Sequence, residues 1–416
     1  MTELSVLIVN YNSWRECATA IESLRQNAPT RPDGSPMPYE CIVVDNLSPQ
    51  RDPAAIAAVE TELKKVADEQ RDPLAGRLIL HTENGGYSKG MNVAFRHSRG
   101  RFVLVSNPDV VFLAGLLDSL HRHLVADPSA GCVVPKGFWD LGCTGHLPPN
   151  TLPTLWDVWV TTLADFLPSV WRWYSRHLAR SWVRAWTAEQ PFALPMMSGC
   201  MFLIERGYFE SIGTFDERYP LYYEDTDLSM KIRRTGRRVV QVPDAHLVHF
   251  VNRSGISDPQ MITSRHDTSR VLYYRKWYGA IGPWTLKAAA WLLSAPGLAK
   301  LRRTLRSLRP VDLGASTERP VLVFPRHCER YLVLMSLGNR FYLSGGTFGS
   351  GDRWTPSDAM WANFASTTFY FAAFDVAGAR WEPLGTWSWR SLSHLGTPTV
   401  STPAKAAAPA VAGGTP

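Results

Sequence analysis

Three carboxylates stand together at the start of a helical pattern in the second half of the chain. The run Tyr222–Leu228 contains Glu224, Asp225 and Asp227, and Gly236 ends the helical pattern. Carboxylates at a helix start commonly cap the helix and stabilise its dipole, so we expect at least one of the three to do so. The preceding tyrosines provide apolar walls, against which a carboxylate becomes a more effective general base. Proton abstraction is therefore one chemistry that this run predicts.

Two further aspartates follow predicted strands. Asp45 comes directly after the run Cys41–Val44, while Asn107 and Asp109 come after the run Phe102–Val105. Ligands of open parallel sheets bind beyond the carboxyl ends of the strands, so we expect both positions to flank one crevice. An aspartate after a strand is most often a turn or cap residue. As functional residues, Asp45 suits a base imide or ribose, and Asp109 suits a divalent ion that bridges a diphosphate.

A glycine-rich turn, Asn84–Asn92, lies between these aspartates and leads into a helix. Its backbone amides suit close approach to a ligand, although an ordinary helix start is the simpler interpretation. Met91 stands where a P-loop has its lysine, and the glycine spacing differs from that of dinucleotide-binding turns. The turn alone therefore identifies no nucleotide site.

Two histidines, His246 and His249, lie on a strand-like run, Ala245–Val251. A spacing of three along a strand directs side chains to opposite faces, so we expect only one of them to reach the site. A lone histidine is more often a structural hydrogen-bonding residue than a ligand. An imidazole joined to Asp109 and a diphosphate would nevertheless make a metal site.

The elements that must position these residues follow an α/β pattern. Alternation of short β-branched runs with amphipathic stretches predicts a parallel sheet with helices on both faces. A later strand, Cys200–Ile204, precedes the helix that opens near Glu224. The predicted strands of the first third are Leu4–Val9, Cys41–Val44, Leu78–His81 and Phe102–Val105.

Six tryptophans crowd among helix formers between residues 148 and 193. We expect a helical insertion there, and two interpretations of its aromatic side chains stay open. They form a packed core, or they form a surface that faces an acceptor or a membrane, since large apolar patches are rare on soluble monomers.

The C-terminal third changes character twice. The run Gly279–Ala299 is apolar but interrupted by prolines, which makes it a poor transmembrane candidate. Residues 300–309 alternate basic side chains with leucines, as expected of a helix on an anionic bilayer or of a basic helix packed on the catalytic domain. Strand patterns follow at Val321–Phe324 and Tyr331–Leu337, and a two-residue turn predicts a hairpin with Arg340–Leu343.

Composition narrows the class of protein. The 416 residues carry a formal net charge of +7, which favours anionic partners such as nucleotide diphosphates, lipid phosphates or an acidic membrane surface. Six scattered cysteines form no metal-ligand or redox spacing, and the N-terminus lacks the pattern of a signal peptide. We therefore expect a reduced, cytoplasmic protein, with peripheral binding to the inner face of the plasma membrane left open.

In this order and spacing, the motifs resemble those of the family-2 glycosyltransferases, especially the bacterial branch that includes rhamnosyltransferases. The resemblance covers about Ser5 to Tyr278. The matching residues are Val9–Asn12, Val44–Asn46, Asn84–Asn92, Ser106–Val110, Ser198–Cys200, Gly213–Glu217, Tyr223–Leu228 and His249.

The resemblance implies an A-type glycosyltransferase fold, a Rossmann-like, mostly parallel sheet with flanking helices. It implies that Tyr11 and Asp45 hold the nucleobase and ribose, with Asn84 nearby. Asp109 would be the metal-binding acid of an Asp-x-Asp motif in which Asn107 replaces the first acid.

With only one acid in that motif, the divalent metal, Mg²⁺ or Mn²⁺, would rely more on the diphosphate and on His249. The resemblance further implies that Asp225 is the general base. Glu224 would orient the acceptor or adjust the basicity of Asp225.

These inferences predict a metal-dependent, inverting glycosyltransferase of cell-surface polysaccharide synthesis. It would move a sugar, rhamnose being one candidate, from a nucleotide diphosphate to a hydroxyl of a saccharide or polyprenyl-linked saccharide, with no nucleic-acid partner. The expected parts are a catalytic domain over 1–278 with the insertion at 148–193, a helical segment over 279–310, a small β domain over 311–396 and a disordered tail over 397–416.

Two other classes compete with this prediction. A binding or scaffold protein on a degenerate transferase fold would use the tryptophan-rich insertion and the β domain as its working surfaces, but Asp109, Asp225 and His249 are intact. A nucleotidyltransferase would normally show a glycine-rich loop with basic residues directly after its first strand. That place is held here by Asn10–Ser13.

Overall fold

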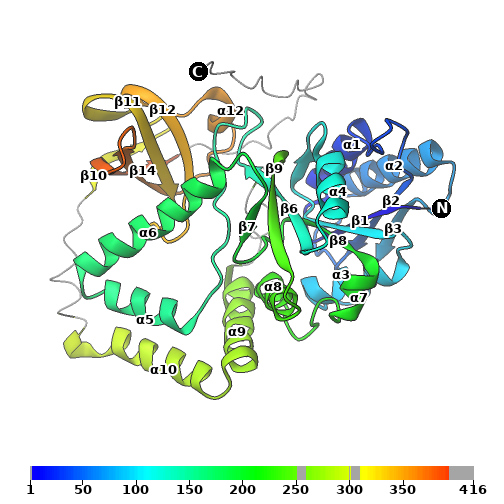
Figure 1. Ribbon diagram of the computed structural model, residues 1–416, viewed down its shortest axis with the longest axis horizontal. Helices are drawn as coiled ribbons and strands as arrows, with labels where there is room; N and C mark the ends of the chain where they lie inside the picture. Colours follow the sequence, from blue (N-terminus) through cyan, green and yellow to red (C-terminus); the bar gives the residue numbers. More distant parts are fainter. Residues whose placement is uncertain (1, 251–258, 299, 301–309, 393–416) are drawn as a thin grey trace. The chain divides into compact units, whose positions relative to one another are not determined.

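The computed structural model describes residues 2–250, 259–298, 300 and 310–392. The chain divides into two compact units, each formed by segments that are distant in the sequence (Figure 1). The first unit comprises Met1–Lys136 and Glu189–Thr263, and the second comprises Gly137–Ala188 and Ser264–Pro398.

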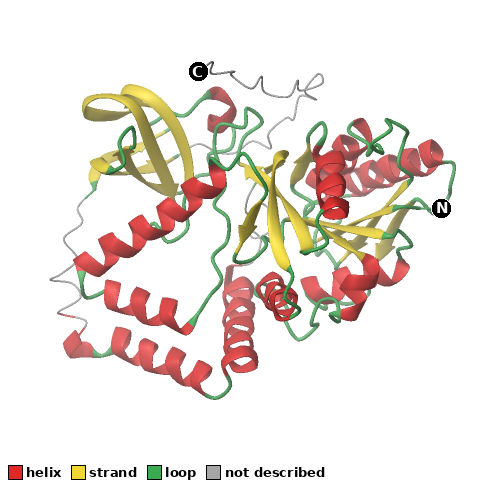
Figure 2. Cartoon of the chain, in the orientation of Figure 1, coloured by secondary structure: helices red, strands yellow, loops and turns green. Residues whose placement is uncertain are grey.

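The first unit is built on a mixed, nine-stranded sheet of the described residues (Figure 2). Four strands run parallel in the order β3-β2-β1-β4, and β8 continues the sheet antiparallel to β4. The strands of the parallel half are β1 (Leu4–Asn10), β2 (Tyr39–Asp45), β3 (Gly76–Leu80) and β4 (Phe102–Ser106). The others are β5 (Val110–Phe112), β6 (Ala130–Phe138), β7 (Phe192–Leu194), β8 (Met201–Glu205) and β9 (Arg238–His249).

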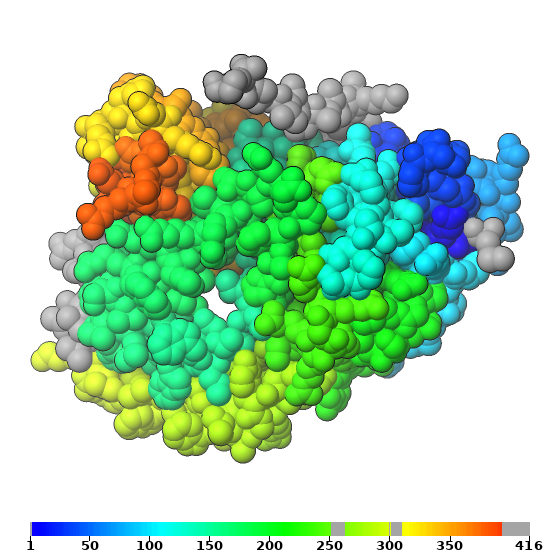
Figure 3. Space-filling model, in the orientation of Figure 1, coloured from blue at the N-terminus to red at the C-terminus, as the bar shows by residue number. Residues whose placement is uncertain are grey.

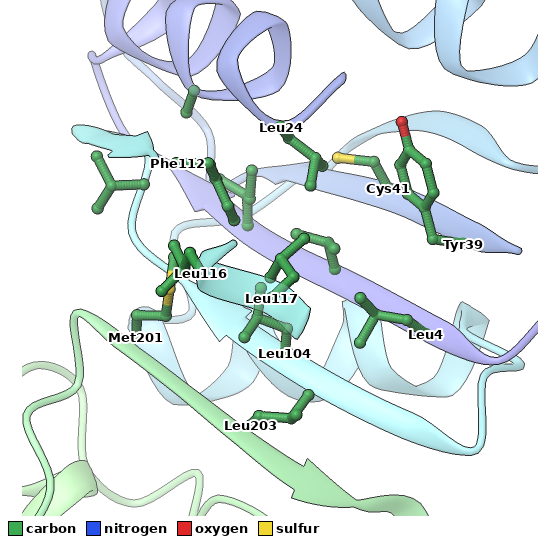
Figure 4. Close-up of a cluster of buried hydrophobic side chains, with 14 of the residues drawn as sticks. Leu4, Leu24, Tyr39, Cys41, Leu104, Phe112, Leu116, Leu117, Met201 and Leu203 are labelled. Carbon is green, nitrogen blue, oxygen red and sulfur yellow. The ribbon is translucent and has the colours of Figure 1, made fainter. Parts of the chain in front are cut away.

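Helices cover both faces of this sheet, as the alternating sequence pattern predicts. Helix α1 shows the reason, because Cys17, Ala20, Ile21 and Leu24 recur at helical spacing and are fully buried. Their cluster, part of which Figure 4 shows, joins α1, α2 and α4 to the sheet. The helices are α1 (Trp14–Gln26), α2 (Pro53–Gln70), α3 (Tyr87–His97), α4 (Leu116–Ala126), α7 (Arg206–Ser211) and α8 (Glu224–Arg234).

Strand pairing brings several chain segments to one edge of the sheet. Asn10 at the end of β1 pairs with Asp45 at the end of β2. Ser106 at the end of β4 pairs with Met201, where the antiparallel β8 begins. His249 at the end of β9 pairs with Val110, close behind Asp109. The predicted site residues that follow these strands therefore share an edge.

The second unit combines helices with a five-stranded sheet of order β10-β14-β13-β11-β12. Its helices are α5 (Leu155–Ala164), α6 (Pro168–Trp186), α9 (Pro259–Tyr278, of which the part from Ser264 belongs here), α10 (Ile281–Ser294) and α12 (Asp358–Trp361). Its strands are β10 (Val311–Ser316), β11 (Leu322–Ser336), β12 (Gly345–Trp354), β13 (Thr368–Asp375) and β14 (Glu382–Ser391).

The tryptophan-rich segment packs on the C-terminal sheet. Trp171, Trp182 and Trp186 of α6 are buried in one cluster with Leu332 and Leu334 of β11. The segment therefore belongs to the same compact unit as that sheet, whereas we expected an insertion of a catalytic domain over 1–278. The interpretation as a packed core therefore holds for these three tryptophans, whereas Trp156 and Trp173 are exposed.

The connection after β11 differs from the predicted hairpin. We expected a two-residue turn and a strand over Arg340–Leu343, whereas β12 begins only at Gly345. The carbonyl of Arg340 accepts a hydrogen bond from Trp171 Nε1 (3.0 Å), and Phe341 is buried in the cluster of α6. These contacts hold the segment as a loop against the helix, so tertiary packing overrides the local turn signal.

Two predictions fall on other parts of the chain. The basic residues after Lys300, at 301–309, and the tail at 397–416 lie outside the described residues. No helix within the described residues has both the length and the apolar content that crossing a membrane requires.

Candidate active site

Asp45 is the fixed acidic group at the end of β2. It is fully buried, and its carboxylate accepts hydrogen bonds from Asn10 Nδ2 (3.0 Å) and the backbone amide of Ser48 (3.1 Å). Arg51 Nη2 lies 3.5 Å from the same carboxylate. The group is therefore held in one orientation, as a residue that receives donors from a ligand must be.

The glycine-rich turn is tied to this group through its first residue. Asn84 Oδ1 accepts hydrogen bonds from Asn46 Nδ2 (3.0 Å) and from the amide of Gly86 (3.2 Å). The turn then enters α3 at Tyr87, whose amide donates to the carbonyl of Pro220 (3.0 Å). The turn is thus fastened between the end of β2 and the segment that precedes the acidic cluster.

Gly86 is required at this position for two reasons. Its φ of 87° and ψ of 171° fall in a region that is essentially restricted to glycine. A Cβ atom there would lie 2.4 Å from the carbonyl oxygen of Pro220. Gly86→Ala is expected to destabilise the protein by about 2 kcal/mol or more and to lower Tm by about 5 °C, measured by differential scanning calorimetry.

Gly207→Ala supplies the control for this prediction. Gly207 lies inside α7, and nothing approaches the position of its added Cβ within 4 Å. The substitution should leave Tm unchanged or raise it slightly, because alanine favours the helix. Equal Tm values for the two variants would show that the turn at Gly86 rearranges without cost.

Asp109 and His249 meet where β5 and β9 pair. His249 Nε2 lies 3.2 Å from Asp109 Oδ1 and 3.4 Å from Asn107 Nδ2. The contact with Asp109 is an ion pair and not a well-directed hydrogen bond, so Oδ1 lacks a hydrogen-bond donor among the described residues. Of the two histidines on β9, His246 contacts the carbonyl of Pro243 instead (3.0 Å).

The protonation of His249 is set by its partner. Burial alone would lower the pKa of His249, but the charge of Asp109 outweighs it and raises the pKa to about 10. A pKa this high keeps the imidazole of His249 protonated at neutral pH. A bound divalent cation would take the place of that proton, since only a neutral imidazole ligates.

Asp225 and Glu224 open α8 beside the start of β8. Asp225 Oδ2 accepts a hydrogen bond from the amide of Gly199 (3.0 Å), and Oδ1 accepts one from the amide of Thr226 (2.7 Å). The neighbouring Glu224 is buried, and its Oε2 receives no hydrogen bond within the described residues. The third carboxylate, Asp227, accepts a hydrogen bond from a distant side chain, the hydroxyl of Tyr219 (3.2 Å).

Burial makes both carboxylates of this pair more basic than usual. The pKa of Asp225 is raised by burial, against the opposing effect of its two amide hydrogen bonds. The pKa of Glu224 is raised well above its ordinary value by burial and then by the charge of Asp225. A carboxylate with a raised pKa is a better proton acceptor, which is what a general base needs.

Two consecutive residues, Gly199 and Cys200, join the two acidic regions. Gly199 donates its amide hydrogen to Asp225, and the carbonyl of the next residue, Cys200, accepts a hydrogen bond from the amide of Asn107 (2.8 Å). Consecutive Cα atoms lie about 3.8 Å apart, so Asp225 and the Asn107–Asp109 turn are anchored side by side.

The hydroxyl of Tyr87 is affected by both acidic regions, that of Asp225 and that of Asp109. It donates a hydrogen bond to the carbonyl of Gly199 (3.3 Å). Its pKa is raised well above the usual value by burial and then by the charges of the surrounding acids, which are Glu224, Asp225, Cys200 and Asp109. The acids of α8 and of the turn after β4 thus both raise the pKa of one phenol.

Unpartnered polar atoms gather in this region. Buried side-chain atoms that lack a hydrogen-bond partner within the described residues are uncommon in folded proteins and call for an explanation. Those near the sheet edge are Asn12 Nδ2, Asn46 Oδ1, Ser88 Oγ, Asp109 Oδ1 and Glu224 Oε2. A polar ligand that occupies the edge would satisfy them.

The protein groups fit a divalent metal only together with a ligand. The described residues contain no group of three or more histidine, cysteine, aspartate or glutamate side chains that would hold a metal. The Asp109 carboxylate and the imidazole of His249, which face each other across 3.2 Å, offer two ligands. Mg²⁺ and Mn²⁺ sites commonly take one or two protein ligands and complete their shell with phosphate oxygens and water. The pair therefore suits a cation that arrives with a diphosphate.

The remaining predicted residue is less constrained. Tyr11 follows Asn10 and is half-buried, and its carbonyl accepts a weak hydrogen bond from Ser13 Oγ (3.4 Å). Its phenol forms no hydrogen bond or ring contact with the part of the chain that the structure describes.

Three residues that hold the site together have no role in the prediction from sequence. Asn10 orients Asp45, Gly199 binds Asp225, and Tyr87 donates a hydrogen bond to the carbonyl of Gly199. All three stand in the matched motifs, so their place in those motifs was the available signal.

The chain is similar in sequence to known proteins. The chain is 29% identical over 202 residues to N-acetylglucosaminyl-diphospho-decaprenol L-rhamnosyltransferase of Mycobacterium tuberculosis, an alignment that spans 46% of this chain and 62% of that protein. It is also 32% identical over 101 residues to the O-antigen biosynthesis protein RfbC of Myxococcus xanthus, covering 24% of this chain and 7% of that one.

Among solved structures, the chain is similar to a mannosyltransferase from Pyrobaculum calidifontis in complex with GDP-Man and Mn²⁺. The identity is 20%, the TM-score is 0.43, and the match covers 73% of each chain. Residues 5–213, half of the chain, match the family described as "Glycosyl transferase family 2". The predicted resemblance is thereby confirmed, and the chain belongs to glycosyl transferase family 2.

Proposed function

We propose that this protein is a metal-dependent, inverting glycosyltransferase. It transfers a sugar from a nucleotide diphosphate to a hydroxyl of a saccharide or of a lipid-linked saccharide. The observation that carries the proposal is the convergence described above, in which Gly199 and Cys200 anchor Asp225 next to the turn that bears Asp109. A proton acceptor and a group suited to a diphosphate are thereby brought into one region.

Asp225 is the general base in this proposal. An acceptor hydroxyl is a poor nucleophile at neutral pH, so a positioned carboxylate must take its proton as it attacks the anomeric carbon. Asp225 meets this need because two backbone amides fix its orientation while burial raises its pKa. A single in-line displacement inverts the anomeric centre. Glu224 is buried beside it, its Oε2 lacks a hydrogen-bond partner within the described residues, and it orients the acceptor or tunes Asp225.

The donor lies along the sheet edge in this proposal. Asp45 and Tyr11 hold the nucleobase and ribose, and Asn84 contributes from the glycine-rich turn. Asp109 and His249 would hold the divalent cation, and Asn107 would bind the substrate. When bound, that cation supplies Lewis-acid stabilisation of the charge that develops on the departing diphosphate.

The sugar and the acceptor are proposed from the mycobacterial relative. Its name specifies L-rhamnosyl transfer to a diphospho-decaprenol-linked N-acetylglucosamine. We propose rhamnose as a donor sugar and a polyprenyl-linked saccharide as an acceptor, in cell-surface polysaccharide synthesis. Such an acceptor implies a cytoplasmic enzyme at the inner face of the plasma membrane, and the net charge of +7 suits an anionic surface.

A thermal-shift panel tests donor binding directly. Thymidine and uridine diphosphate sugars, rhamnose included, are added to the full chain with manganese or with a chelator. A ligand at about 100 times its Kd stabilises the native state by about 2.7 kcal/mol, so the matching donor should raise Tm by several degrees. The rise should disappear with the chelator. A panel in which no sugar nucleotide shifts Tm would overturn the proposal.

A further inference from the structure

Helix α10 carries its largest apolar side chains on the outside. Ile281, Trp284 and Trp291 are 62%, 64% and 67% exposed. With about 100° per residue, these three positions lie within roughly 80° of one another around the helix axis. We call these three side chains the tryptophan face. In the space-filling view, the surface of α10 appears in yellow-green (Figure 3).

The buried side of α10 is centred about 120° around the helix axis from the tryptophan face and is made of small residues. Gly282, Thr285 and Ala289 are its buried positions. Gly282 packs so closely that a Cβ atom would lie 2.2 Å from the carbonyl oxygen of Tyr274 in α9. The helix is therefore inverted relative to an ordinary amphipathic helix, since the residues with most apolar area face away from the protein.

The neighbouring helix α5 repeats the pattern. Helices α5 and α10 lie side by side in the second unit (Figure 1). Trp156 and Leu163 of α5, seven residues apart and so on one side of it, are 65% and 48% exposed. Exposed apolar area of this extent on adjacent helices indicates a binding surface rather than scattered surface residues.

The basic side chains of these helices favour an anionic partner. Helix α10 contains Lys287 and no acidic residue. Helix α5 contains one acidic residue, Asp157, which caps its own helix and accepts a hydrogen bond from the hydroxyl of Tyr174 in α6. Helix α6, which packs against α5, contains no acidic residue and four arginines: Arg172, Arg176, Arg180 and Arg184. Tryptophan is favoured at the boundary between lipid headgroups and acyl chains, and basic side chains favour anionic headgroups. Two copies of the face would instead bring like charges together.

From this combination we infer that the tryptophan face of α10 docks on an anionic phospholipid bilayer. Trp284 and Trp291 enter the interfacial layer, and Lys287 reaches the headgroups. The inference rests on the proposed function in one respect, because a lipid-linked acceptor would bring the enzyme to a bilayer. Binding to vesicles requires no sugar nucleotide, so it can fail while donor binding holds.

Vesicle sedimentation of the full chain tests the inference. The probes are vesicles of phosphatidylcholine alone and vesicles of phosphatidylcholine with phosphatidylglycerol. The wild-type chain should bind the anionic vesicles more strongly than the neutral ones. Trp284→Ser combined with Trp291→Ser should lower the partition coefficient by about tenfold or more, because two large apolar side chains no longer enter the bilayer.

A matched pair of substitutions controls for loss of exposed apolar area. Val323 and Leu337 of the same unit are 62% and 58% exposed, and Val323→Ser with Leu337→Ser should leave vesicle binding unchanged. The donor-induced Tm rise should be the same in all three proteins, which shows that they are folded.

Three outcomes would overturn the inference. The wild-type chain fails to bind anionic vesicles, or the tryptophan variant binds them as well as the wild type does. In the third, sedimentation velocity shows a wild-type dimer that the tryptophan substitutions dissociate, with no vesicle binding by either protein, which would assign the face to self-association.

Discussion

Asp225→Asn is expected to remove sugar transfer while leaving donor binding largely intact. The asparagine keeps the size of the side chain and still accepts a hydrogen bond from the amide of Gly199, but it has no basic oxygen. General base catalysis contributes roughly 10²- to 10⁴-fold to a rate, so the transfer rate should fall by about that factor. The measurements are product formation from a radiolabelled donor and the Tm rise on donor binding.

Asp227→Asn is the matched control in the same helical turn. Asp227 is buried and accepts a hydrogen bond from the hydroxyl of Tyr219, which makes it a structural carboxylate. The substitution should lower Tm with a much smaller effect on transfer. Normal transfer by the Asp225→Asn protein would refute the assignment of the base, as would a larger loss of transfer in the Asp227→Asn protein.

The pH dependence of the wild-type rate gives a second measure of the base. Burial raises the pKa of Asp225, so this carboxylate stays protonated at a higher pH than an ordinary aspartate. A protonated carboxyl cannot accept the acceptor's proton. The transfer rate should therefore rise with pH through the raised pKa of the acidic pair, and this acidic limb should be absent in the Asp225→Asn protein.

Asp109→Ala is expected to weaken donor binding in a way that depends on metal. The substitution removes one of the two protein groups that suit the cation, and His249 loses its buried counter-charge. A charge-assisted contact of ~1.5–3 kcal/mol corresponds to about a 10- to 100-fold loss of affinity. Titration calorimetry with and without manganese should show that manganese strengthens donor binding by the wild type and no longer does so in the variant.

Asp118→Ala separates this effect from a loss of stability. Asp118 accepts hydrogen bonds from the amide (2.7 Å) and hydroxyl (3.0 Å) of Thr30, so its removal should lower Tm without changing metal-linked donor affinity. If the wild-type chain binds donor equally well in a chelator, the cation has no part in binding. In that case the imidazolium of His249 would be the counter-charge of the diphosphate.

The sheet that carries the site was predictable from local pattern. Runs such as Leu4–Val9 and Phe102–Val105 are β-branched and apolar because both faces of a parallel sheet are covered, and they form β1 and β4. The position of the aspartates after these strands followed from the same pattern. Their roles in catalysis stay predictions.

Other features depend on contacts between distant segments and leave little trace in the local sequence. The loop at Arg340–Leu343 reads as a strand but is held by Trp171, about 170 residues away in the chain. The grouping of α6 with the C-terminal sheet likewise depends on a buried cluster that joins the two. The link from Gly199 to Asp225 exists only once β8 pairs with β4.

The adjacency of Gly199 and Cys200 has a consequence for how such an enzyme changes its substrates. Under the proposed roles, the peptide unit that joins Gly199 to Cys200, just before β8, sets the distance between the general base Asp225 and the turn that holds the leaving diphosphate. Surface loops around the start of β8 tolerate replacement far better than the strands do. Redesign of those loops should therefore exchange one sugar or acceptor for another while the reacting atoms keep their spacing.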